Sequence, residues 1–83
     1  MTDEKLLRAE LIKAGVSTKE AAQWLGISLQ TFLSKIQNVR EFKASEIYML
    51  RKRLKLTPSM QEKIFFAPRV DGKSTLASKA VNG

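Results

Sequence analysis

Hydrophobic residues recur every three or four positions in several short segments of this 83-residue chain. Such spacing places the hydrophobic side chains on one face of an α-helix, whereas a half-buried strand would alternate at every second position. The pattern predicts helices over residues 3–14, 18–25, 29–37, 44–54 and 58–65. The expected fold class is therefore all-α, a compact bundle of about five short helices.

Residues that start and stop helices support these boundaries. Thr2 is expected to cap the first helix, and Gly15 is expected to end it, because glycine adopts the left-handed conformation without steric penalty. Thr57 followed by Pro58 marks the start of the last helix, since proline at the first helical position has no N–H to leave unpaired.

The segment 17–37 contains two helices joined by a tight turn. Ser17 and Glu20 have the spacing of a capping box, in which the serine side chain and the glutamate side chain each bond the other residue's backbone N–H. Gly26 can end the first of these helices, and Ser28 can cap the second. Two helices joined in this way describe a helix-turn-helix, whose second helix fits the DNA major groove.

The spacing of Ala22, Gly26, Ile27 and Phe32 resembles the helix-turn-helix of the phage Cro and repressor family, the Xre type, and the resemblance covers about residues 5–66. It implies a lambda-repressor-like bundle with a central helix-turn-helix. It also implies a sequence-specific regulator of transcription, in which the second helix of the motif reads DNA.

Two further features bear on this resemblance. The segment 54–57 and the end of the last helix, Ile64-Phe65-Phe66, are similar to the tail of small Cro-like phage regulators. The family usually has an apolar residue at the position of Lys35, and here Ile36 is expected to take that place.

The composition excludes several classes of function. The chain has no cysteine and no histidine, which removes thiolate metal sites, zinc fingers and histidine-based acid–base chemistry. The carboxylates are scattered along the chain without a nucleophile and base beside them, so no enzyme, cofactor or metal is expected. No apolar run is long enough to span a bilayer, and the acidic start does not look like a signal peptide. We expect a cytoplasmic protein of a bacterial host cell, associated with the nucleoid.

The net charge of +7 favours an acidic partner. Many of the basic residues lie in or after the second helix of the motif, which favours nucleic acid, although a solvated face remains the alternative for the run Arg51-Lys52-Arg53.

Residues for DNA contact follow from the expected helix at 29–37. If Phe32 and Ile36 point inward, steps of about 100° place Gln30, Ser34 and Gln37 on the exposed face. Amide side chains match the adenine edge, and the family resemblance also implies base contacts at Leu29, Gln30 and Ser34. Phosphate contacts are expected from residues that offer donors around this helix, namely Ser17, Thr18, Lys19, Thr31, Lys35, Asn38, Arg40 and Lys43.

The leading hypothesis is a helix-turn-helix DNA-binding domain at residues 1–67, which binds a double-stranded DNA operator and forms a homodimer there. Residues 68–83 are too poor in bulky apolar groups to form a core and are expected to be a flexible basic tail. The alternative is a protein-interaction module, antirepressor-like or antitoxin-like, in which Trp24, Tyr48 and Phe66 dock onto a partner.

Overall fold

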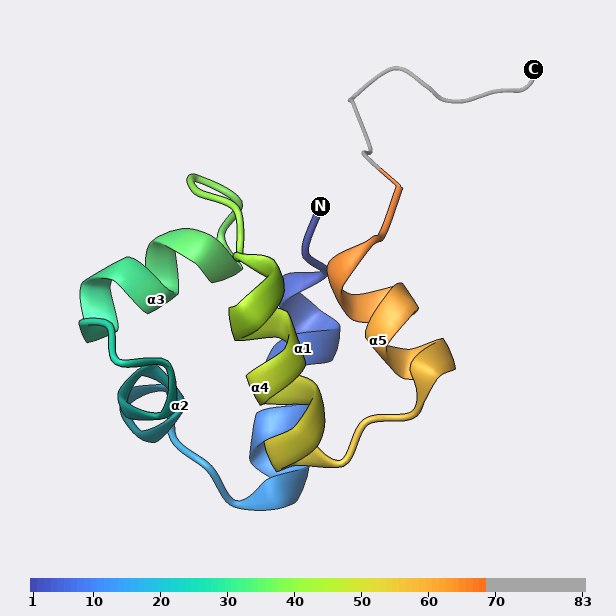
Figure 1. The fold of residues 1–83 in the computed structure, drawn as a ribbon, viewed down its shortest axis with the longest axis horizontal. Coiled ribbons are helices and arrows are strands. Elements are labelled where there is room, and N and C mark those ends of the chain that lie inside the picture. The colour runs from blue at the N-terminus through green and yellow to red at the C-terminus, as the bar shows by residue number, and fades with distance from the viewer. Residues whose placement is uncertain (69–83) are drawn as a thin grey trace.

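The computed structural model describes residues 1–68, which contain five α-helices and no strand (Figure 1). The helices are α1 (Glu4–Ala14), α2 (Thr18–Leu25), α3 (Leu29–Ile36), α4 (Ala44–Leu54) and α5 (Pro58–Phe65). The predicted all-α class is confirmed, as are the predicted bounds of the second, fourth and fifth helices. The tail predicted for residues 68–83 lies, apart from Pro68, outside the described residues.

The start of α1 differs from the prediction. The helix begins at Glu4, and the carboxylate of Asp3 accepts the N–H of Leu6 at 3.1 Å. Asp3 is therefore the N-cap, and the prediction that Thr2 caps this helix is wrong. The other end agrees with the sequence, because Gly15 ends the helix in the left-handed conformation with a φ of 70°.

One hydrophobic core joins all the helices. Helix α4 packs against α1, α2 and α5, and Figure 1 shows it between α5 on one side and α2 with α3 on the other. The buried hydrophobic residues are Leu7, Leu11, Ala21, Ala22, Phe32, Ile36, Leu50, Leu56, Ile64 and Phe65. Ala14 follows Leu7 and Leu11 at helical spacing, but it is the last residue of α1 and is exposed.

Aromatic rings link the loop before α4 to the core. The Phe42 ring lies edge-on to Phe32 with the ring centres 5.8 Å apart, and edge-on to Phe65 with the centres 5.5 Å apart. Such edge-to-face pairs contribute about 0.5–1.5 kcal/mol beyond the burial of their surface. Phe42 therefore connects α3 to α5 and anchors the segment just before α4 to the core.

The first residues of the chain bind both the end of α5 and the loop after α3. The Thr2 N–H donates to Asn38 Oδ1 at 2.8 Å, and Asn38 Nδ2 donates to the Thr2 carbonyl at 2.9 Å. The Asp3 N–H donates to the Ile64 carbonyl at 2.6 Å. Asn38 itself has a φ of 65°, a left-handed conformation that asparagine tolerates better than most residues. The sequence contains no simple signal for this long-range contact.

None of the helices within residues 1–68 is long and apolar enough to cross a membrane.

We predict that Asn38→Gly will lower the free energy of unfolding by about 2 kcal/mol, because two hydrogen bonds to Thr2 are lost. Asn38→Ala should lower it by about 1 kcal/mol more, since alanine disfavours the left-handed backbone. Urea unfolding at pH 7 measures both values. A glycine variant as stable as the wild type would show that the bonds to Thr2 contribute nothing.

Candidate nucleic-acid interface

Helix α2 begins with the predicted capping box. The Ser17 hydroxyl accepts the Glu20 N–H at 3.0 Å, and the Glu20 carboxylate accepts the Ser17 N–H at 3.0 Å. The helix ends at Gly26, which has a φ of 69°, and the Ile27 N–H then donates to the Ala22 carbonyl at 3.1 Å. A side chain at Gly26 would meet no atom within 4 Å, so the glycine is favoured by its backbone conformation alone.

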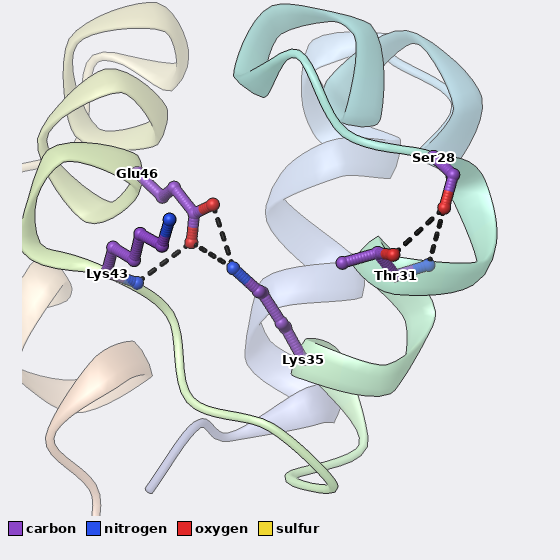
Figure 2. A network of polar contacts seen from close by, with 5 residues as sticks. All are labelled: Ser28, Thr31, Lys35, Lys43 and Glu46. Carbon is purple, nitrogen blue, oxygen red and sulfur yellow. Dashed lines mark hydrogen bonds and ion pairs between the residues drawn. The ribbon is translucent and has the colours of Figure 1, made fainter.

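Helix α3 begins directly after this turn. The Ser28 hydroxyl accepts the Thr31 N–H at 3.0 Å and lies 2.9 Å from the Thr31 hydroxyl, as Figure 2 shows. Ser28 is therefore the predicted cap, and only residues 26–28 separate the two helices. The Thr31 hydroxyl, predicted to contact phosphate, accepts a hydrogen bond from the Ser28 hydroxyl at the exposed start of α3.

The two sides of α3 differ sharply in burial. Phe32 and Ile36 are fully buried, whereas Gln30 and Gln37 are exposed and Ser34 is half-buried. Leu29 is 39% exposed and does not belong to the core. Figure 1 shows α3 at the outer edge of the molecule. All four residues predicted to contact bases are therefore accessible to solvent.

The loop after α3 folds back onto the end of that helix. The Ser34 carbonyl accepts the N–H of Val39 at 2.9 Å and the N–H of Arg40 at 3.3 Å. This arrangement brings the exposed Arg40 beside Ser34, so a predicted phosphate contact and a predicted base contact are neighbours in space.

The structure contradicts the prediction that Lys35 contacts phosphate. Its side chain points into the molecule, only 5% of the residue is exposed, and its Nζ lies 2.6 and 2.8 Å from the two carboxylate oxygens of Glu46 (Figure 2). Ile36 is buried as expected, but Lys35 is buried beside it. Position 35, which is usually apolar in the Cro and repressor family that the sequence resembles, is thus occupied here by a lysine whose charge is paired with Glu46.

Glu46 performs two tasks at the start of α4. Besides pairing with Lys35, its Oε1 accepts the Lys43 N–H at 2.8 Å, which satisfies one of the free donors at the helix N-terminus. Burial alone would raise the pKa of the Glu46 carboxyl, but the hydrogen bonds from Lys35 and the Lys43 backbone, with the charges of both lysines, hold this pKa below its usual value of 4.5.

The other residues predicted to contact phosphate divide into two groups. Three of them have exposed side chains: Lys19 in α2, Arg40 in the loop after α3, and Lys43 just before α4. Ser17 and Thr18 stand at the N-terminus of α2. The Asn38 amide, in contrast, uses both its oxygen and its nitrogen to bind the Thr2 backbone. The contact with Thr2 accounts for the asparagine at position 38 without any DNA contact.

The basic run of α4 does not surround α3. Helix α4 begins beside the end of α3 and runs away from it, so its basic last turn lies at the far end (Figure 1). There the Arg53 guanidinium lies over the Trp24 ring, 5.3 Å from its centre, and the Lys52 ammonium lies over the Tyr48 ring at 5.4 Å. Trp24 packs against the core at the same time.

The buried pair of Lys35 and Glu46 was not predicted from the sequence. One signal was present: Glu46 stands three residues after Lys43, which is the spacing of a capping glutamate. Lysine cannot accept the reciprocal bond, so the pattern did not look like a capping box.

Within residues 1–68, no group of three or more acidic, histidine or cysteine side chains is placed to hold a metal ion. Searches of family models, of curated proteins and of solved structures find no match to this chain.

The depressed pKa of Glu46 predicts a specific pH dependence. The paired carboxylate stabilises the fold above pH 4.5, and this contribution disappears as the pH falls through the folded-state pKa. At pH 7 Glu46→Gln should lower the free energy of unfolding by about 3 kcal/mol, because it leaves the Lys35 ammonium buried without a counter-charge. The difference between wild type and variant should shrink below pH 4.5.

Denaturant unfolding at several pH values measures this difference. The control is Glu62→Gln, which removes an exposed carboxylate on α5 and should change stability by less than about 0.5 kcal/mol at pH 7. A Glu46→Gln deficit that stays constant down to pH 3 would refute the assignment of this charge pair.

Proposed function

We propose that this protein is a sequence-specific, double-stranded DNA-binding regulator that inserts α3 into the major groove. Helix α2, the turn at 26–28 and α3 would form its helix-turn-helix. The observation that carries the proposal is the two-sided character of α3, with Phe32 and Ile36 buried and Gln30 exposed. Gln37, which directly follows the helix as its C-cap, is exposed as well. A major groove admits one helix, and a helix held from one side by its own core leaves the other side free to contact base edges.

The exposed side of α3 has suitable chemistry for base recognition. The Gln30 and Gln37 amides each offer a donor and an acceptor, which match N6 and N7 of adenine. A serine hydroxyl such as that of Ser34 can bond several base edges, and the exposed Leu29 side chain suits a thymine methyl group. These four residues would give sequence preference.

Contacts with the DNA backbone would come from the segments that flank α3. Lys19 lies in the first turn of α2, and Arg40 and Lys43 lie in the loop and cap between α3 and α4. Exposed cations of this kind neutralise phosphates without reading sequence, and they fix the orientation of the protein on the duplex.

The mode of regulation rests on the resemblance to phage Cro and repressor proteins. In this proposal the protein occupies an operator in the bacterial cytoplasm and blocks or redirects transcription there. A homodimer would read two half-sites about 34 Å apart, one helical turn of DNA.

A second candidate function is a protein-interaction module. Tyr48 and Phe66 are 53% and 58% exposed and border a groove between α4 and α5 that is also lined by Phe42, Ile47 and Arg51. A protein that gives no DNA shift in dilute buffer, yet forms a stable complex that Tyr48→Ala weakens, would favour this candidate.

We predict that Gln30→Ala will reduce the preference for the best DNA site by about tenfold, because one amide–base pair discriminates by about 1–3 kcal/mol. Binding to non-specific DNA should change little. Selection of sites from random DNA, followed by titration of the best site and a scrambled site, measures both quantities. Gln61→Ala, on α5, is the matched control and should behave as the wild type.

We predict that Arg40→Ala will weaken binding to all sequences by a similar factor. It should also make the slope of log K against log salt shallower by about one unit, since one phosphate contact is lost. Titrations between 50 and 200 mM salt, about the range in which such slopes are measured, provide the test. Lys63→Ala removes an exposed charge from α5 and should leave the slope unchanged. Equal slopes for all three proteins would remove Arg40 from the interface.

A further inference from the structure

Lys35 and Glu46 are the only charged residues among 1–68 that are buried, at 5% and 6% exposure. They join the last turn of α3 to the first turn of α4 through two short bonds of 2.6 and 2.8 Å (Figure 2). The surface ion pair of Glu4 and Arg8 on α1 differs, since both of its side chains are 40% exposed.

Stability alone is a weak explanation for such a pair. Removing two charges from water is unfavourable, and a buried ion pair is often matched or exceeded in stability by uncharged side chains of similar volume. The best-supported role of a buried polar contact is to select one arrangement among several that hydrophobic packing would allow. Phe32 and Ile36 pack without directional bonds, whereas the Lys35 ammonium must meet two oxygen atoms of fixed position.

The carboxylate is itself held in place. Glu46 Oε1 also accepts the Lys43 N–H at 2.8 Å, so it is bound to the N-terminus of α4. The last turn of α3 is thereby bound to the N-terminus of α4, while its first turn follows the tight turn in which the Ile27 N–H donates to the Ala22 carbonyl of α2. Lys35 directly follows Ser34 and stands five residues after Gln30. A rotation of α3 by one residue, about 100°, would move both side chains off the outer face.

We infer that the pair of Lys35 and Glu46 positions the recognition surface by fixing the rotation of α3 on α4, and thereby sets the sequence specificity of DNA binding. The two residues contact no base; they act through Gln30, Ser34 and Gln37. The inference rests on the proposed function for its effect on DNA, while the orientation of α3 is measurable without DNA.

The test is the double variant Lys35→Met/Glu46→Gln. It removes both charges, keeps the length of the Glu46 side chain, shortens that of Lys35 by one heavy atom and retains an oxygen that can accept the Lys43 N–H. We expect it to fold, with a denaturation midpoint close to that of the wild type. The ratio of specific to non-specific DNA affinity should fall about tenfold, the loss expected from one misplaced amide–base pair. Residual dipolar couplings of the free protein should report a changed direction of α3 relative to α4.

The matched control is Glu4→Gln/Arg8→Met, which neutralises the exposed ion pair of α1 and should leave the affinity ratio and the couplings unchanged. A Lys35→Met/Glu46→Gln protein with the wild-type affinity ratio and unchanged couplings would overturn the inference. So would a double variant that does not fold, because the pair would then be needed for the fold itself. If the wild type has no sequence preference, the proposed function fails and the couplings alone decide whether the pair orients α3.

Discussion

The burial of one side of α3 is the constraint on which the rest of the structure depends. Phe32 and Ile36 are fully enclosed, and the Phe42 ring lies edge-on between Phe32 and Phe65. Small domains are stabilised by only about 5–15 kcal/mol, and truncating one buried aromatic residue removes about 3–5 kcal/mol. The core therefore has little tolerance at these positions. Because the opposite side of the same helix is polar and exposed, the packing that stabilises the fold also decides which side chains α3 presents to solvent.

Within this small core, a buried charge needs a complete set of partners. The Lys35 ammonium is matched by both oxygens of Glu46, and one of these oxygens also bonds the backbone at the start of α4. The hydrophobic core that Phe32 and Ile36 share with Leu50 of α4 contributes to stability, but hydrophobic burial has no preferred direction. The ion pair, in contrast, requires the Lys35 ammonium to meet the two oxygens of Glu46. Hydrophobic burial thus stabilises α3 in the core, and the ion pair restricts its orientation.

Local signals predicted most of the fold. The capping box at Ser17, the left-handed Gly26 and the proline at the start of α5 depend on residues close in sequence, and each was found where expected. The signals that failed depend on distant residues. Helical spacing defines the buried side of α3 only to within one residue, so Lys35 was placed outside, although the partner that allows its burial stands eleven residues later. The basic run at 51–53 is near α3 in sequence but not in space, because α4 leads it away.

The contacts made by the first residues also bear on the order in which the chain folds. Helices α2 and α3 meet through neighbours in sequence, so their pairing closes only a small loop. The amino group of Met1 instead meets the carbonyl of Ala67, across 66 positions, and Thr2 meets Asn38 across 36. Closing such long loops costs more conformational entropy than local pairing does. The hydrogen bonds that offset this cost form only once the helices are in place. We expect α2 and α3 to assemble early and the N-terminal segment to dock last, onto helices that are already packed.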